Sequence, residues 1–432
     1  MRKAFSMWDT LMESLQWLVF LLANALALPV IIGQIYRLSP VEVADLMQRT
    51  LFVVGLTSFL QGRWGHRLPV ADGPAGLWLG IFVILGLSSV QAGASASTTL
   101  QALEGAMLVT GAALFWLGIS GWTGRILSLF SPLVIGTNLL LLAIQLSGTF
   151  LKGMLGIGDR VHPMSVGMAL TAFGVFLSVL GLSIWGKGFV KSYAVLIGIA
   201  AGWLVFVLLG WHERTNVTAP FRLPTLFAWG LPRWDFGLIV TGVMMALVLL
   251  SNVVASVSAV RQVVGFKGEE IQTFNRSSWV GGLSNAVSAL FSTVGMVPLS
   301  ISAGFIQMTG QKRLLPFMMA CASLVIVSFF PILTSFLAML PGPVAYAAML
   351  ASFTQMVGIG LRALWSREPD QRRLTIIGVS ISLGTGVMFL PPEVFVHMPS
   401  VLQNVTGNGL MVGTLIALIL EQVWRERPEN AQ

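Results

Sequence analysis

The sequence predicts an all-α polytopic membrane protein with about fourteen transmembrane segments, arranged as two inverted repeats of seven spans each. Three observations support this fold class. The 432 residues are 55% hydrophobic and only 10% charged, and the mean hydropathy of +0.83 lies far outside the range of soluble domains. The apolar residues fall into about fourteen runs, each near the roughly 20 residues that a helix needs to cross a bilayer. The third and tenth runs are interrupted at corresponding places in the two halves.

Segments three and ten share the same kind of interruption. Segment three contains RLPVADGPAGLWLGIF, in which Pro69, Gly73 and Pro74 break the first half. Segment ten lies within FSTVGMVPLSISAGFIQMTGQKR and is broken by Gly295 and Pro298. Because proline and glycine both oppose a continuous helix, we expect discontinuous segments, each a short extended stretch followed by a half-helix. A half-helix that begins inside the bilayer directs unpaired N–H groups at whatever lies there, which predicts a ligand site at the two breaks.

The distribution of Lys and Arg predicts the orientation. With the N-terminus in the cytoplasm, most of the 25 Lys and Arg residues fall in cytoplasmic loops, as the positive-inside rule requires. We therefore expect a multi-pass protein of the cytoplasmic (inner) membrane, with both termini inside and no cleavable signal peptide before the first span. The cationic residues expected outside are Arg37, Arg49, Lys152, Arg160, Arg214, Arg222 and Arg233.

Composition also argues against several function classes. The single cysteine, Cys321, excludes an intramolecular disulfide and lies in an apolar segment, where packing is its ordinary role. The sequence contains no cluster of metal ligands, no Gly-rich phosphate loop and no nucleophilic triad, so we expect no metal, no cofactor and no enzyme activity. The formal charge of +8 is spread over short loops, so membrane orientation explains it better than binding to nucleic acid.

Segment ten also carries a recognisable spacing of residues. The frame starts with Ile301 and Ser302, continues with Gly304 two residues later, and ends with Thr309 and Gly310. This spacing resembles the signature of the nucleobase-ascorbate transporters, which include bacterial xanthine and uracil permeases. That signature is Gln, Glu or Pro, then Asn, any residue, Gly, four residues, Thr, and Arg, Lys or Gly. The last three fixed positions are kept here and the first two differ.

Other landmarks extend this resemblance over the whole chain. Gln16 with Trp17 stands where the first helix of the family usually has Gln-His, which makes the chain similar to the branch of purine permeases with Gln-Trp. The remaining landmarks are Leu28-Pro29 in the first segment, Leu68-Pro69 in the third, and Arg276 with Gly282 in the ninth.

The paired breaks and the resemblance lead us to expect two domains, each built from both repeats. The expected core domain comprises residues 1–121 (spans one to four) and 236–338 (spans eight to eleven, the last at 313–338). The expected gate domain comprises residues 122–211 (spans five to seven) and 339–432 (spans twelve to fourteen). Residues 212–235 form a polar loop between the repeats.

The resemblance implies a secondary active transporter that imports a nucleobase by proton symport and forms a homodimer in the lipid bilayer. The expected substrate is a purine of the xanthine, uric acid or hypoxanthine type, with uracil next. Matched to the family's frame, the residues expected to line the substrate site are Asn24, Gly76, Leu77, Ser251, Asn252, Ser300 and Ser302.

This lining departs from the family pattern. Ser251 and Ile301 stand where the uracil and xanthine permeases carry a Glu and a Gln or Glu that hold the base. Either hydroxyls, amides and backbone groups take over this task, or the ligand differs. Each serine could instead bond to its own helix or pack a close helix crossing. Asn252 is the sharper candidate, because an amide is costly to leave unpaired in hydrocarbon.

Two acidic residues lie well inside predicted segments. Asp72 stands beside the break of segment three, and Glu104 lies in segment four. A carboxyl group in lipid is cheapest to bury when protonated, so both are candidates for proton coupling. Asp72 could instead cap the following half-helix, and Glu104 could lie near the outer surface. In some members of the family a His is linked to proton coupling, and Ala255 stands at that position here. Of the two remaining candidates we expect Glu104 to carry the proton, because Asp72 could instead serve as a helix cap.

Two alternatives remain. A transporter of sulfate or bicarbonate with the same seven-plus-seven architecture would suit two positive half-helix ends and a pocket without carboxylates. A membrane sensor that does not transport belongs to a different class, although the chain has no recognisable signalling domain. Uptake of labelled purines, uracil and sulfate separates these hypotheses.

Overall fold

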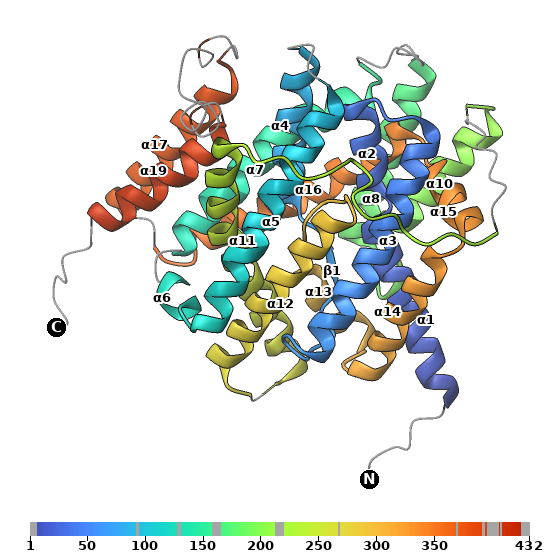
Figure 1. The fold of residues 1–432 in the computed structure, drawn as a ribbon, viewed down its shortest axis with the longest axis horizontal. Coiled ribbons are helices and arrows are strands. Elements are labelled where there is room, and N and C mark those ends of the chain that lie inside the picture. The colour runs from blue at the N-terminus through green and yellow to red at the C-terminus, as the bar shows by residue number, and fades with distance from the viewer. Residues whose placement is uncertain are drawn as a thin grey trace.

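The fold is that of an all-helical polytopic membrane protein, as the composition predicts. The computed structural model describes residues 7–91, 95–127, 131–157, 166–211, 220–266, 268–368, 370–390, 394, 406 and 408–424. In Figure 1 the helices surround strand β1, which lies near the middle of the molecule.

The first half of the chain contains one short strand between long helices. Its elements are α1 (Met7–Ala25), α2 (Ala27–Tyr36), α3 (Pro40–Arg63), β1 (Asp72–Pro74), α4 (Gly76–Gln91), α5 (Ala96–Ser120), α6 (Thr123–Leu127), α7 (Pro132–Met154), α8 (Val166–Trp185), α9 (Phe189–Ser192) and α10 (Ala194–Leu208).

The second half has a similar order, again with one strand followed directly by a helix. Its elements are α11 (Phe236–Val264), α12 (Glu270–Leu290), β2 (Met296–Pro298), α13 (Ile301–Thr309), α14 (Leu314–Ser328), α15 (Pro331–Ala338), α16 (Gly342–Leu364), α17 (Gln371–Met388) and α19 (Gly409–Val423).

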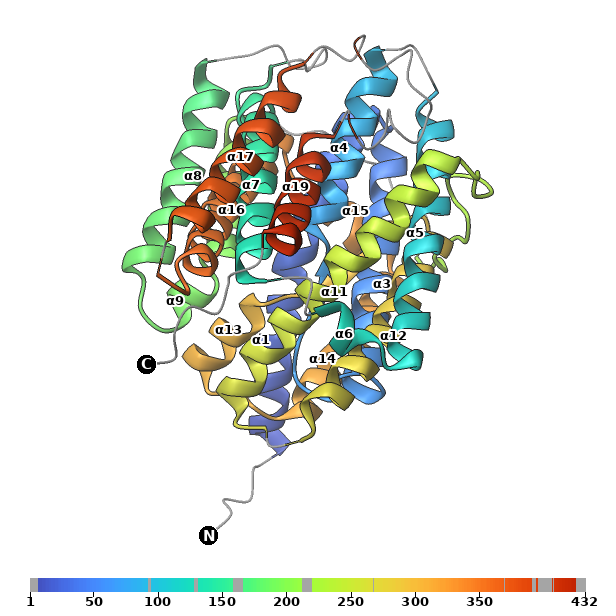
Figure 2. The same cartoon turned by 90° about the vertical axis from the view of Figure 1, so that its left-hand side faces the viewer.

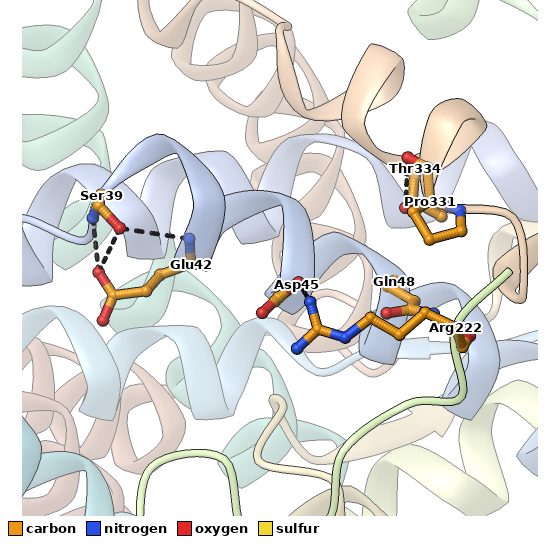
Figure 3. Close-up of polar contacts among 7 residues, drawn as sticks. All are labelled: Ser39, Glu42, Asp45, Gln48, Arg222, Pro331 and Thr334. Atoms are coloured by element: carbon orange, nitrogen blue, oxygen red, sulfur yellow. Dashed lines mark hydrogen bonds and ion pairs between the residues drawn. The ribbon is translucent and has the colours of Figure 1, made fainter. Parts of the chain in front are cut away.

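Capping residues define where α3 begins. The Ser39 hydroxyl accepts a hydrogen bond from the Glu42 N–H at 3.4 Å, and the Glu42 carboxylate accepts one from the Ser39 N–H at 2.7 Å (Figure 3). Pro40 occupies the first helical position, where its missing N–H would be unpaired in any case. This reciprocal pair satisfies two donors that a helix start leaves free.

Length and composition support fewer spans than the fourteen that we expect. Among the described residues, seven helices are long and apolar enough to cross a membrane, and an eighth span results if the bent pair α14 and α15 counts as one. Three further apolar helices, α4, α10 and α19, are shorter. The count of fourteen therefore stays a prediction.

One expected segment is not continuous. Residues 313–338 were expected to form the eleventh span, but α14 ends at Ser328 and α15 begins at Pro331, with an angle of 91° between them. Proline has no N–H to continue the helix, and it drives the preceding Phe330 into an extended conformation. The chain therefore turns sharply within the expected eleventh span, a break that the sequence analysis does not predict.

The interruptions of segments three and ten are confirmed. Strands β1 and β2 are three residues long and pair antiparallel, with Asp72 opposite Pro298 and Pro74 opposite Met296. Each strand is followed within three residues by a helix, α4 after β1 and α13 after β2. Every residue of both strands is buried, so these extended stretches lie inside the protein rather than against lipid.

The helices pack in two groups. In one group, α7, α8, α16, α17 and α19 pack together at the upper left of Figure 2, and α10 packs on α8 and α16. In the other, α1, α3, α5, α11, α12 and α14 pack around the two strands. Part of the first group has a separate hydrophobic cluster, which includes Leu133, Ile376 and Ala417. The two groups meet where α2 and α4 contact α16 and α7.

Candidate functional site

The start of α4 presents unpaired backbone donors. The Ala75 N–H donates to the Gly295 carbonyl at 2.9 Å, which continues the strand pairing up to the helix. The next two N–H groups, those of Gly76 and Leu77, have no backbone acceptor within the described part of the chain. A helix start of this kind attracts a group that can accept hydrogen bonds, such as a carbonyl oxygen or an anion.

Three side chains join α11 to the start of α13. The Ser256 hydroxyl donates to Asn252 Oδ1 at 3.1 Å, and the Ser256 and Ser300 hydroxyl oxygens are 2.7 Å apart. Ser256 has one proton, which it gives to Asn252, so Ser300 must donate to Ser256. The Asn252 Nδ2 group has no partner among the described residues and remains a donor, while the Ser300 oxygen keeps a free acceptor site. Asn252 and Ser300 are only half-buried, so both can face a ligand.

Three other predicted residues use their side chains for contacts within the fold. The fully buried Ser302 hydroxyl accepts the Ala71 N–H at 3.1 Å, which ties α13 to the residue before β1. Ser251 donates to a carbonyl of its own helix three residues earlier at 2.7 Å, and Asn24 donates to one four residues earlier, also at 2.7 Å. The structure therefore brings Asn252 and Ser300 together and gives Ser302 a contact within the fold.

Gly76 lies between the two helix groups. A Cβ atom at this position would be 3.3 Å from the Phe353 ring of α16, so even the smallest side chain would require the ring to shift slightly. The neighbouring Leu77 is buried. The unpaired N–H groups of α4 are thus near the boundary with the group that contains α16.

Trp78 fixes the direction of α4 through a buried hydrogen bond. Its indole N–H donates to Asn285 Oδ1 at 3.0 Å, and Asn285 Nδ2 donates to the Met296 carbonyl at 3.2 Å. A Cβ on Gly295 would be 2.3 Å from Trp78 Nε1, which explains why glycine stands before β2. Helices α4 and α12 and strand β2 are therefore held by one buried polar contact.

The exposed face of α13 is uncharged and is open at its start. The Ile301 side chain is 43% exposed, and no atom lies within 4 Å of a Cβ built on Gly304. Ala255 of α11 is also exposed. Ile301 and Ala255 stand where members of the family that the sequence resembles carry polar groups. This surface therefore leaves room for a ligand but carries no charge.

The end of α13 accounts for the last part of the sequence signature. The Thr309 hydroxyl donates to the Phe305 carbonyl at 2.7 Å, and Gly310 adopts φ +74°. A left-handed residue after a helix is most readily glycine, so Thr309 and Gly310 end the half-helix. The signature here has a structural explanation that does not require contact with a ligand.

Gln16 is part of a contact between the two helix groups. Its side-chain oxygen accepts a hydrogen bond from Gln311, and its backbone carbonyl accepts one from the Tyr193 hydroxyl at 3.0 Å. The Tyr193 ring also lies edge-on to Phe305 of α13, with ring centroids 5.9 Å apart. Gln16 therefore links α1 to the segment after α13 and to the start of α10.

The two predicted coupling residues lie in different surroundings. The Asp72 N–H donates to Ser58 at 2.9 Å, and Asp72 Oδ2 accepts from Ser284 at 3.3 Å. In the described residues no Lys or Arg forms an ion pair with Asp72, and Oδ1 has no partner. Glu104 instead accepts from Ser292 at 2.5 Å and interacts with the charge of Arg49. No hydrogen bond joins either carboxyl group to Asn252 or Ser300 within the described chain.

Sequence reasoning missed Ser256, which connects the two predicted polar residues. Its position was a usable signal, since residues four apart on a helix share a face and Ser256 follows Asn252 by four. Its partner Ser300 is 44 residues away, so the contact itself could not be read from the spacing. Among the described residues, no group of three His, Cys, Asp or Glu side chains could hold a metal ion.

Comparison with solved structures gives the fold. Murine Slc26a9, described as an anion transporter in the inward-facing state, matches with a TM-score of 0.65 at 12% identity, over 98% of this chain and 70% of that one. The transmembrane domain of BicA, a cyanobacterium bicarbonate transporter, matches with a TM-score of 0.55 at 15% identity, over 96% of this chain and 98% of BicA. At such identities the likeness shows a shared fold and nothing of the substrate.

Sequence comparison gives the family. The xanthine/uracil permease model, described as "Permease family", matches residues 9–393. YwdJ of Bacillus subtilis (strain 168) is 32% identical over 430 residues, which are 96% of this chain and 97% of YwdJ. The uric acid permease PucK and the xanthine permease of the same organism are each 25% identical, over 100% and 98% of this chain and 99% and 95% of their own. The expectation from segment ten is thus confirmed: the protein belongs to the xanthine/uracil permease family and is a multi-pass membrane transporter, not an enzyme.

Proposed function

We propose that the protein imports a nucleobase, a purine of the xanthine, uric acid or hypoxanthine type in the first place and uracil next. The names of PucK and of the Bacillus subtilis xanthine permease support this choice of substrate class, since those relatives match the chain along nearly its whole length. The substrate would bind where α4 and α13 begin, next to α11.

The chain of Asn252, Ser256 and Ser300 is the observation that carries the proposal. It leaves one donor on Asn252 and one acceptor on Ser300, held together by a single buried hydroxyl. An oxopurine or uracil edge carries a carbonyl acceptor beside an N–H donor, so it can bond to both groups at once. The free N–H groups of Gly76 and Leu77 would then take a second carbonyl oxygen of the base.

We further propose how the scaffold carries the substrate. The chain would form fourteen spans in two inverted repeats, with both termini in the cytoplasm and a homodimer as the assembly. The group around β1 and β2 would be the core domain (1–121 and 236–338), and the group with α7, α8 and α16 would belong to the gate domain (122–211 and 339–432). The contact of Gly76 with Phe353 supports a binding site at the boundary, where relative motion of the domains would expose it to either side.

Proton symport is the coupling that we propose. Of the two carboxyl groups, Asp72 is the better carrier on the structural evidence, because its contacts are hydroxyl and backbone groups and it can be buried neutral. Glu104 accepts the hydrogen bond of Ser292 at the turn toward β2, which gives it a structural role instead.

An anion such as sulfate remains the second candidate. The unpaired N–H groups at the start of α4 suit an anion as well as a carbonyl oxygen. The acceptor on Ser300 argues against sulfate, which has no proton to donate at neutral pH, but not against bicarbonate, which has one.

Uptake into proteoliposomes tests the proposal. Purified protein is reconstituted, and accumulation of labelled xanthine, uric acid, hypoxanthine, uracil and sulfate is measured with an inward proton gradient, a sodium gradient or no gradient. We expect saturable uptake of at least one oxopurine that the proton gradient increases and that excess sulfate leaves unchanged. Uptake of sulfate alone would support the anion carrier. Uptake that is the same with and without a proton gradient would contradict proton symport.

A further inference from the structure

The described part of the loop between the halves, residues 220–235, lies against α3 and is called the connecting loop below. The Arg222 side chain forms an ion pair with Asp45 at 2.7 Å, and the Arg222 carbonyl accepts from Gln48 at 2.7 Å. Figure 3 shows the Arg222 side chain extended toward Asp45. The Arg222 N–H donates to the Phe329 carbonyl at 3.0 Å. One end of the connecting loop is therefore attached to α3 and to the end of α14.

The middle of the connecting loop is attached to α5 and to the chain that leads into β2. Gln101 of α5 donates to the Trp229 carbonyl at 2.9 Å and accepts the Arg233 N–H at 3.0 Å. The Trp229 N–H donates to the Ser292 hydroxyl at 3.3 Å. These bonds fix Trp229 above the residues that precede β2.

A buried polar cluster lies beneath Trp229. Arg49 is 4% exposed and its guanidinium carbon is 6.0 Å from the centre of the Trp229 ring, while Glu104 is fully buried and accepts from Ser292. Three atoms have no hydrogen-bond partner within the described residues: Arg49 Nε, Trp229 Nε1 and Glu104 Oε2. Two are donors and the third is an acceptor. The Arg49 guanidinium interacts with the charges of Asp45 and Glu104, but no direct ion pair joins it to Glu104 in the described part of the chain, so a buried mediator between the two groups would lower the cost of burying both charges.

We propose that Arg49, Glu104 and Trp229 enclose a binding site for one water molecule, which bridges the buried charges of Arg49 and Glu104 and fastens the connecting loop to the core. A water that accepts from Arg49 and Trp229 and donates to Glu104 satisfies all three atoms, and about three hydrogen bonds is the usual number for a buried water. The chemistry of the site, two donors facing one acceptor around a balanced charge, selects water over a free ion.

The cluster also has a positioning role for the substrate site. Ser292 adopts φ +49°, a left-handed conformation that is costly for a residue with a side chain. Its hydroxyl is held from both sides, by Glu104 and by the Trp229 N–H. Ser292 stands at the turn from α12 toward β2, so the cluster sets the direction in which segment ten enters the strand pair.

A double-mutant cycle on the unliganded protein tests this inference without reference to transport. Arg49→Met leaves the Glu104 carboxyl group without its neighbouring cation, and Glu104→Gln leaves Arg49 with Asp45 as its main opposite charge. Each should therefore lower the melting temperature and speed hydrogen exchange in residues 220–235 and 292–299. The double variant Arg49→Met/Glu104→Gln removes both charges and should recover most of the loss. The control is Glu13→Gln with Arg313→Met, a partly exposed ion pair between α1 and the start of α14, whose variants should leave exchange in residues 220–235 unchanged.

A high-resolution experimental structure tests the ligand. A water within hydrogen-bond distance of Arg49 Nε, Trp229 Nε1 and Glu104 Oε2 is the expected result, and a direct contact between Arg49 and Glu104 would overturn the water site. If the losses of stability in the two single variants add up in the double variant, or if hydrogen exchange in residues 220–235 is unchanged, Arg49 and Glu104 do not hold the connecting loop. Failure of nucleobase uptake leaves both readouts unaffected, so the two proposals fail independently.

Discussion

Ser256 is the single residue on which the proposed recognition of a base depends most. It is fully buried, and it orients both the Asn252 amide and the Ser300 hydroxyl. In a site without carboxylates, orientation of neutral groups decides which hydrogen bonds a ligand can make, because an unpaired buried donor or acceptor is costly.

We expect Ser256→Ala to weaken binding of the transported base by about 1–3 kcal/mol, similar to Asn252→Ala, because both remove an oriented partner. Isothermal titration calorimetry on purified, folded variants measures this. Ser178→Ala on the exposed face of α8, where the hydroxyl donates to its own helix at 2.7 Å, is the control and should bind normally. Wild-type affinity of Ser256→Ala would show that Asn252 and Ser300 do not act as a unit.

Ser302 should behave differently from Ser300. Its hydroxyl accepts the buried Ala71 N–H, so Ser302→Ala leaves that donor unpaired and should lower the free energy of unfolding by about 1–3 kcal/mol. A lower melting temperature with unchanged affinity of the remaining folded protein is the expected result. If Ser302→Ala lowers the affinity for the base without lowering the stability, Ser302 contacts the substrate, as its place in the signature predicts.

At the scale of elements, the strand pair and its two half-helices form one mechanical unit. Trp78 of α4 bonds to Asn285 of α12, which bonds to the Met296 carbonyl of β2. Replacing a glycine inside this unit should therefore lower the stability of the fold, because it disturbs all three elements. The same replacement on the open face of α13 should change only the binding of the ligand.

Gly295→Ala and Gly304→Ala test this contrast with one substitution at two places in segment ten. At Gly295 the new methyl would lie 2.3 Å from Trp78 Nε1, so the Trp78–Asn285 bond must break and we expect a loss of about 1–3 kcal/mol in stability. At Gly304 no atom is within 4 Å, so the fold should tolerate alanine while the KM for uptake changes. Thermal denaturation and uptake kinetics separate the two effects, and equal destabilisation by both would contradict the open face of α13.

At the scale of the whole molecule, transport requires a carboxyl group that can carry a proton while the core moves. The sequence favours Glu104, whereas the hydrogen bond with Ser292 gives Glu104 a fixed position beneath the connecting loop. Asp72 lies in β1 itself, at the centre of the proposed core, and is surrounded by Ser58 and Ser284.

We therefore expect Asp72→Asn to retain exchange of substrate across the membrane but to lose accumulation driven by a proton gradient, because exchange needs no net movement of protons. The double variant Arg49→Met/Glu104→Gln should keep proton-driven accumulation in the fraction that folds. Counterflow and gradient-driven uptake in the same proteoliposomes measure both properties. Accumulation that survives Asp72→Asn and disappears in the double variant would restore Glu104 as the carrier.

The sequence by itself determined the class of the protein and the places where two segments break. Hydrophobic composition leaves a bilayer as the only solvent in which the chain can bury its surface, and the combination of Pro74 with Gly73, and of Gly295 with Pro298, strongly disfavours a continuous helix. The spacing of Gly304, Thr309 and Gly310 was enough to indicate the family, although the structure gives the last two a role in ending α13.

Only the tertiary structure decided what each polar side chain contacts. Ser302 and Ala71 are 231 residues apart, Glu104 and Ser292 are 188 apart, and Ser256 and Ser300 are 44 apart. Periodicity reports which face of a helix a residue occupies, but the partner on another element depends on how distant helices pack. For this reason the sequence identified Asn252 and Ser300 as polar groups in an apolar environment, while the hydroxyl that joins them emerged from the packing of α11 against α13.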